Sequence, residues 1–292
     1  MTEPRLRHVL CLASSALHRM AYWEWGDAHN PRVLVCVHGL TRQGRDFDTL
    51  ALDLCGEYRV VCPDVVGRGR SDRLADPLAY AVPTYVADMV TLLARLDVEQ
   101  VDWVGTSMGA LIGLGIASMA NSPVRRFVIN DFGPVVEPGF MQRLGTYLGV
   151  PMHWKTEEEA AAALQLISHG FGPHTREQWL ALTRPQLVAE VKDGVSGFKP
   201  RYDPAIAVPV RAITPESAAA GQAVQWHLYD QIRCPTLLLR GAESDLLSLA
   251  TAQAMTARGP KPRLHQFAGV GHAPTLVQPD QRAVVRDFLL GP

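Results

Sequence analysis

One serine stands between two glycines in residues 105–109, which read Gly-Thr-Ser-Met-Gly. The apolar run 100–105 before it is typical of a buried strand, and residues 108–120 are typical of a helix. Glycine costs either element about 0.5–1 kcal/mol relative to alanine, so neither element explains the pattern. A sharp strand-to-helix turn explains it, because small flanking residues let the strand and the helix approach while the serine Oγ projects outward. Ser107 is therefore predicted to be a nucleophile.

A serine hydroxyl needs a general base, and the base needs an acid to orient it. His272 directly follows a predicted strand, in the segment Gly-Val-Gly-His-Ala-Pro. Asp245 lies just past another predicted strand, and its loop follows the strand immediately before the one that carries His272. We therefore favour Asp245 as the acid, while Asp131 and Glu243 are alternatives that also follow strands. The chain order is then Ser107, Asp245, His272, which resembles the order in α/β-hydrolases.

The reaction also needs two N–H donors for the oxyanion that develops on the attacked carbonyl. The backbone N–H of Met108, next to the nucleophile, is one candidate. The backbone N–H of Leu40, in a loop after an early strand, is the other. Gly39 lets the chain turn there, and the preceding His38 completes a short His-Gly motif.

The elements that must position these residues alternate between strand and helix, which predicts a parallel sheet with helices on both faces. An N-terminal hairpin is expected to end at Gly26-Asp27. Strands are predicted at 32–39, 58–64, 100–105, 125–131, 234–241 and 262–272, and helices at 46–56, 85–98, 108–120 and 282–290. In such sheets, sites form at the carboxyl ends of the strands, which is where the candidate residues fall.

The alternation stops near residue 134, and no buried strand is evident again until residue 234. We expect one α/β core, residues 1–133 and 231–292, with residues 134–230 inserted as a helical cap over the sheet edge. Aromatic residues in this cap, including Trp154 and Trp179, either line a substrate pocket or form the cap's own small core.

Composition narrows the class of protein and its partners. The chain has 292 residues, of which 47% are hydrophobic and 20% charged, and its net charge is −1, so nucleic acid is not an expected partner. No histidine or cysteine pattern matches a metal site, so no metal is expected. The five cysteines show no paired spacing, which favours reduced thiols and a cytoplasmic location. The N-terminal stretch resembles a signal peptide only loosely, and no apolar run is long enough to predict a membrane helix.

The segments HGLTR, DVVGRGRSD, VGTSMG, GAESDLLS and GHAP stand in an order that resembles the α/β-hydrolase superfamily, in its small capped bacterial branch. The resemblance covers essentially the whole core, while the insertion is the family's most variable part. It implies a hydrolase that needs no metal or organic cofactor. It also implies that the stretch 64–72 shapes a turn and is chiefly structural.

A serine at this turn favours an esterase over related enzymes that use an aspartate nucleophile. We expect a hydrolase of small to medium carboxylic esters, which forms an acyl-enzyme and takes a small-molecule substrate. His38, Gly39, Arg42, Trp154 and Trp179 are the predicted substrate-binding residues, with Arg42 able to pair with a substrate carboxylate. The alternatives are a C–C bond hydrolase or enol-lactonase of aromatic catabolism, and a receptor-like binding protein with little turnover. The sequence does not indicate the oligomeric state.

Overall fold

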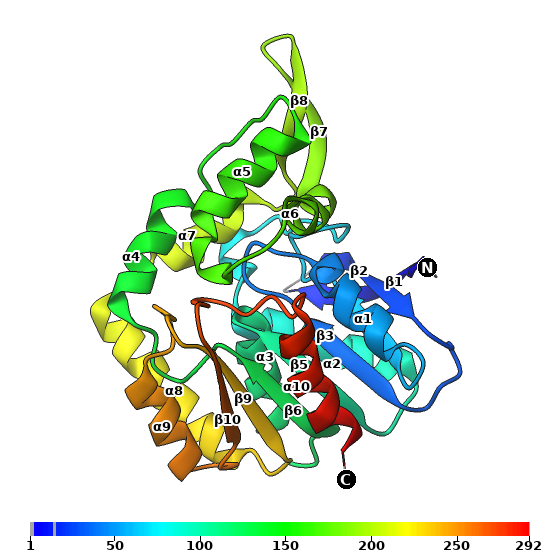
Figure 1. Ribbon diagram of the computed structural model, residues 1–292, viewed down its shortest axis with the longest axis vertical. Coiled ribbons are helices and arrows are strands. Elements are labelled where there is room, and N and C mark those ends of the chain that lie inside the picture. Colours follow the sequence, from blue (N-terminus) through cyan, green and yellow to red (C-terminus); the bar gives the residue numbers. More distant parts are fainter. Residues whose placement is uncertain (1–2, 14–15, 292) are drawn as a thin grey trace.

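The computed structural model describes residues 3–13 and 16–291 and contains one large, mostly parallel sheet (Figure 1). Its eight strands lie in the order β1-β2-β4-β3-β5-β6-β9-β10. Only the pairs β1–β2 and β2–β4 are antiparallel. The strands are β1 (Arg5–Ala13), β2 (Ala16–Trp25), β3 (Val33–Val37), β4 (Arg59–Pro63), β5 (Val101–Thr106), β6 (Val124–Asn130), β9 (Thr236–Gly241) and β10 (Arg263–Phe267). The expected hairpin and parallel sheet are confirmed.

Helices cover both faces of the sheet, because apolar side chains of the central strands point to both faces. Val33, Val35 and Val37 of β3 point into one apolar core, and Leu34 and Cys36 point into the other, because successive side chains of a strand face opposite sides. The first core lies under α2 (Val82–Leu96), α3 (Met108–Ala117), α8 (Pro215–Gln231) and α9 (Leu249–Ala257). The second lies under α1 (Asp48–Leu54) and α10 (Pro279–Leu290).

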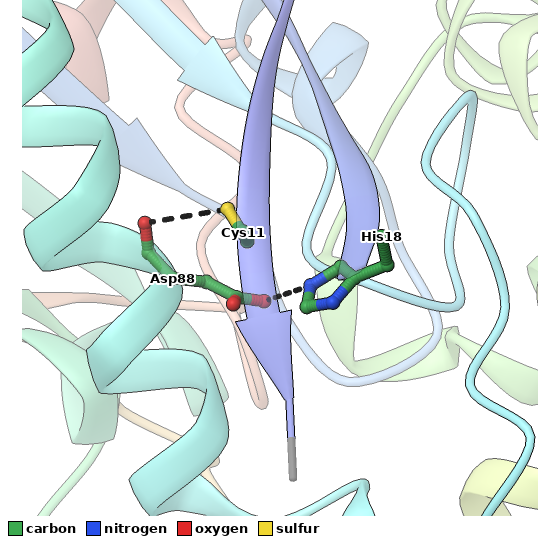
Figure 2. A group of neighbouring side chains, drawn as sticks. All are labelled: Cys11, His18 and Asp88. Atoms are coloured by element: carbon green, nitrogen blue, oxygen red, sulfur yellow. Dashed lines mark hydrogen bonds and ion pairs between the residues drawn. The ribbon is translucent and has the colours of Figure 1, made fainter. Parts of the chain in front are cut away.

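A buried polar link joins the N-terminal hairpin to α2 (Figure 2). Cys11 and His18 lie opposite each other on β1 and β2. His18 Nε2 lies 2.9 Å from Oδ2 of Asp88, which projects from α2, and all three residues are buried. Burial raises the pKa of the Cys11 thiol to about 12, and the nearby Asp88 carboxylate adds to the shift, so the thiol stays protonated. The cluster therefore anchors the hairpin through polar contacts inside an apolar layer.

The inserted segment lies over the carboxyl ends of the central strands, as Figure 1 shows. It carries α4 (Pro138–Tyr147), α5 (Glu157–Ile167), α6 (Arg176–Thr183), α7 (Ala207–Arg211) and the antiparallel hairpin of β7 (Leu187–Lys192) and β8 (Val195–Pro200). The hairpin differs from the expectation of helices and loops alone. Only Leu187 and Gly197 are buried in its two strands, so the strands lack the apolar run by which a buried strand is found.

The end of the insertion also differs from the predicted boundary at residue 230. Helix α8 lies beside the sheet rather than above it in Figure 1, and its Tyr229 is fully buried in the core. The Tyr229 hydroxyl donates to the Met255 carbonyl oxygen of α9 at 2.9 Å. We therefore propose that the inserted cap ends before α8. In the part of the chain that the structure describes, no helix is both long and apolar enough to cross a membrane.

Candidate active site

Ser107 lies on the predicted sharp turn between β5 and α3. Its backbone has φ 54° and ψ −115°, a positive φ that is uncommon for a residue other than glycine. The two flanking glycines are required by close packing. A Cβ at Gly105 would lie 2.4 Å from the Gly109 carbonyl oxygen, and one at Gly109 would lie 1.9 Å from the Val37 carbonyl oxygen. The glycines thus allow α3 to begin directly against β3 and β5, which exposes Ser107 at the sheet edge.

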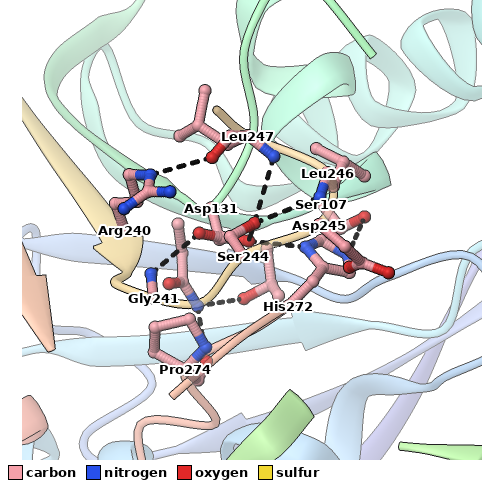
Figure 3. A network of polar contacts seen from close by, with 12 residues as sticks. Ser107, Asp131, Arg240, Gly241, Ser244, Asp245, Leu246, Leu247, His272 and Pro274 are labelled. Carbon is pink, nitrogen blue, oxygen red and sulfur yellow. Dashed lines mark hydrogen bonds and ion pairs between the residues drawn. The ribbon is translucent and has the colours of Figure 1, made fainter. Parts of the chain in front are cut away.

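Ser107, His272 and Asp131 form a continuous line of hydrogen bonds (Figure 3). The Ser107 hydroxyl donates to His272 Nε2 at 2.9 Å, and His272 Nδ1–H donates to Asp131 Oδ2 at 2.7 Å. The aspartate is fully buried and the histidine side chain is 10% exposed. The arrangement holds the imidazole in the tautomer that leaves Nε2 free to accept a proton from the serine.

The loop after β9 holds the Asp131 carboxylate in place. Oδ1 accepts the Gly241 N–H at 2.9 Å, and Oδ2 accepts the Ser244 hydroxyl at 2.6 Å. The neighbouring Asn130, which sequence reasoning missed, donates to Thr106 Oγ1 at 2.9 Å and to the Pro274 carbonyl oxygen at 2.8 Å. These bonds link the serine strand, the aspartate strand and the histidine loop. The signal for Asn130 was only its place before Asp131 at a strand end.

The expected contact between Asp245 and His272 is not formed, and the structure contradicts that assignment. Asp245 lies four positions beyond the end of β9, and its carboxylate binds Arg143 of α4 at 2.6 and 3.0 Å. Burial raises the pKa of Asp245, but hydrogen bonding and charge from Arg143 outweigh it and leave the pKa below its usual value. Asp131, the alternative from the sequence, occupies the position instead. Glu243 makes no hydrogen bond to His272 among the described residues.

The loop after β3 lies against the nucleophile, as the oxyanion prediction requires. A Cβ on Gly39 would lie 3.7 Å from the Ser107 Cβ. Within the described ranges, the N–H groups of Leu40 and Met108 donate to no other protein group. Both amides are therefore available to a substrate oxygen, although their role as the oxyanion hole remains a prediction.

His38 supports this loop and does not line the pocket that contains Ser107. Its Nε2 accepts the Val65 N–H at 3.0 Å, so Nδ1 carries the proton and donates to the Gly39 carbonyl oxygen at 2.7 Å. Burial lowers the pKa of His38 to about 3, which keeps the ring neutral. His38 thus fixes the orientation of the Gly39–Leu40 peptide.

A pocket opens above Ser107 between the core and the cap. Gly39, Leu40, Arg42, Ser107 and His272 line its floor and wall. The cap supplies a mainly apolar roof made of Phe140, Leu144, Tyr147, Met152, Leu164, Ile167, Phe171, Pro200 and Tyr202. The Phe140 ring meets the His272 ring edge-on at a centroid distance of 5.0 Å. Such a lining suits an apolar acyl or alkyl group next to the serine.

The two cap tryptophans that the sequence analysis selected, Trp154 and Trp179, lie outside the lining of the Ser107 pocket. Trp154 pairs through its backbone with Phe198 of β8, and Trp179 stacks on Phe171 with a centroid distance of 5.9 Å. Neither lines the Ser107 pocket, and their role as substrate-binding residues remains a prediction. Both pack within the cap, which was the alternative interpretation of its aromatic residues.

Arg42 does line the pocket, but Asp46 holds it in two hydrogen bonds of 2.6 and 2.9 Å. Its Nη2 also donates to the Leu182 carbonyl oxygen at 3.3 Å, which joins the core loop to α6. Among the described residues, the only group with metal-ligand chemistry is the buried cluster of Cys11, His18 and Asp88. None of its members lines the Ser107 pocket.

A mostly parallel sheet with serine, histidine and aspartate joined at the carboxyl ends of its strands defines the class of α/β-hydrolases. A model of the alpha/beta hydrolase family matches residues 34–286, and the chain belongs to this family.

Individual relatives are similar along nearly their whole length. The chain is 54% identical over 291 residues to a 3-hydroxybutyrate-oligomer hydrolase of Cupriavidus necator, covering 99% of each. It is 27% identical to a 2-hydroxy-6-oxo-2,4-heptadienoate hydrolase of Pseudomonas putida, covering 90% of each. The crystal structure of an alpha/beta hydrolase from Novosphingobium aromaticivorans superposes with a TM-score of 0.83 at 35% identity, covering 99% of each chain.

Proposed function

We propose that the protein is a serine hydrolase that cleaves the ester bonds of short oligomers of 3-hydroxybutyrate or a closely similar hydroxy acid. The observation that carries the catalytic part is the line of hydrogen bonds from Ser107 through His272 to the buried Asp131. The substrate class is supported by the relative of Cupriavidus necator, which is 54% identical over almost the entire chain. The mainly apolar pocket is compatible with short methyl-bearing units.

In the proposed mechanism, Ser107 Oγ attacks the ester carbonyl carbon while its proton passes to His272 Nε2. The N–H groups of Leu40 and Met108 stabilise the negative charge on the carbonyl oxygen. Collapse of the tetrahedral intermediate breaks the ester C–O bond, and the departing alcohol takes the proton from His272. Water then attacks the acyl carbonyl carbon and gives a proton to His272. Collapse of this second tetrahedral intermediate breaks the bond between the acyl carbon and Ser107 Oγ, Ser107 Oγ takes the proton back from His272, and the acid is released. The Asp131 carboxylate, which accepts from His272 Nδ1, stabilises the imidazolium.

The test is release of 3-hydroxybutyrate from its linear dimer by the purified protein and by Ser107→Ala. We expect a loss of kcat of at least ~10³-fold in the variant, because the nucleophile is removed. Ser118→Ala is the matched control, since Ser118 caps the far end of the same helix and its hydroxyl donates to the Gly115 carbonyl oxygen there. Turnover of the dimer that persists in Ser107→Ala would contradict the proposal. Serine-dependent cleavage of a 2-hydroxy-6-oxo-dienoate, without turnover of the dimer, would replace it with C–C hydrolysis.

A further inference from the structure

The charges that face the pocket are of one sign. Arg42 and Arg143 both line it, and no aspartate or glutamate does so among the described residues. Arginine is well suited to bind carboxylates through two parallel hydrogen bonds. A substrate with a free carboxylate would therefore find a complementary charge beside the serine.

The two arginines differ in how their charge is balanced. The partner of Arg42 is Asp46, whose side chain is 17% exposed and also accepts from Gln186, while Arg42 itself is 11% exposed. The partner of Arg143 is Asp245, whose side chain is 40% exposed and lies outside the pocket lining. Water screens an exposed carboxylate, so Asp245 neutralises Arg143 less completely than Asp46 neutralises Arg42.

Arg143 also keeps hydrogen-bonding capacity. Its Nε and Nη2 donate to Asp245, and its Nη1 donates to the Ile167 carbonyl oxygen at 3.3 Å. A guanidinium has five N–H groups, so two remain after these three bonds. Tyr147, one turn further along α4, also lines the pocket, and burial raises the pKa of its hydroxyl above the usual value, although the charge of Arg143 acts in the opposite direction. The phenol is therefore a neutral donor beside the guanidinium.

We propose that Arg143, with the Tyr147 hydroxyl beside it, binds the free carboxylate of the substrate and thereby selects oligomers by their carboxylate end. This inference rests on the proposed function, because it concerns the recognition of the same ester at the same serine. A linear oligomer of a hydroxy acid carries one carboxylate, and its conversion to a methyl ester removes the charge without altering the bond to be cleaved. Asp245 then serves to hold the guanidinium in place and does not act in the chemistry.

The experiment compares kcat/KM for the linear 3-hydroxybutyrate dimer with that for its methyl ester, in the wild type, Arg143→Gln, Asp245→Asn and Arg42→Gln. We expect the wild type to prefer the acid by about 10–100-fold, the usual effect of one charge-assisted pair. Arg143→Gln should lose this preference through a higher KM for the acid, with little change for the methyl ester. Asp245→Asn breaks the same link between α4 and the loop after β9 but keeps the arginine, so the preference for the acid should remain.

Three results would overturn the inference. Equal kcat/KM values for acid and methyl ester in the wild type would show that the carboxylate is not recognised. Equal loss of preference in Arg143→Gln and Asp245→Asn would show that Arg143 acts only through the structure of the cap. Loss of the preference for the acid in Arg42→Gln alone would assign carboxylate binding to Arg42. In each of these cases the proposed function stands as long as serine-dependent ester turnover is present. Absence of such turnover for both the dimer and its methyl ester would overturn the proposed function itself.

Discussion

At the scale of single residues, the surroundings of the two candidate aspartates favour Asp131 as the proposed acid. Asp131 is fully buried and accepts hydrogen bonds from Gly241, Ser244 and His272. Asp245 is 40% exposed and pairs with Arg143. A carboxylate that orients a catalytic histidine must be held rigidly in a site without water, and only Asp131 meets this condition.

Asp131→Asn is therefore expected to lower kcat for ester hydrolysis by about 10⁴-fold, because an amide stabilises the wrong imidazole tautomer. The measurement is steady-state turnover of a p-nitrophenyl ester at neutral pH. Asp245→Asn is the matched control, which removes the same charge from the neighbouring loop and should leave kcat within a few-fold of the wild type. The opposite ranking of the two variants would return the role to Asp245.

His38 predicts a pH dependence of stability. Its pKa is lowered from 6.5 to about 3 by burial, so the unfolded state takes up a proton first as the pH falls. The stability that the neutral ring contributes is complete above about pH 6.5 and is lost as the pH falls toward 3. Between pH 7.5 and pH 5, this loss is about 2 kcal/mol for a single group.

His38→Gln should be less stable than the wild type at neutral pH, because the bonds to Gly39 and Val65 are altered, but it should lose less on acidification. The measurement is the free energy of unfolding in urea at pH 7.5 and pH 5 for both proteins. An unchanged difference between the two pH values in His38→Gln would show that His38 is not the titrating group.

At the scale of elements, the order of the strands explains which parts of the site could be predicted. The turn with Ser107 and the loop with Leu40 are local patterns, since strand, glycines and helix follow one another in the chain. The position of Asp131 depends on β6 lying between β5 and β9, which places its carboxyl end beside both the serine and the histidine loop. Asp131 and Asp245 both follow a strand, so sequence alone could not rank them by contact.

The cap is a second region in which the sequence predicts the elements but not their contacts. Its start near residue 134, its helices and its aromatic content could be predicted from the sequence, but its end and its packing could not. Trp179 turns toward Phe171, while Phe140 and Tyr147 of α4 face the pocket. Which aromatic side chain faces the pocket depends on how the short helices pack on one another, and the sequence of each helix alone does not specify that packing.

At the scale of the whole molecule, the inserted segment lies over the pocket that contains Ser107 (Figure 1). The pocket has a floor from the core and a roof from α4, α5 and β8. The Gly170 carbonyl oxygen of the cap accepts the Gly271 N–H at 2.6 Å, which ties the roof to the histidine loop. A substrate oligomer that binds under this roof must enter the pocket by one of its ends, whereas an open groove would accept any internal segment of the oligomer.

We therefore expect the enzyme to remove units from a chain end, so that kcat/KM per molecule does not rise from dimer to hexamer of 3-hydroxybutyrate. Enclosure is the physical reason, because additional ester bonds outside the pocket do not add sites of attack. The measurement is initial product analysis by chromatography, in which monomer and the oligomer shortened by one unit should appear first. A groove open along its length would instead give kcat/KM in proportion to the number of ester bonds, with trimers among the first products of the hexamer. That result would mean that the cap moves away from the core during turnover, despite the bond between Gly170 and Gly271.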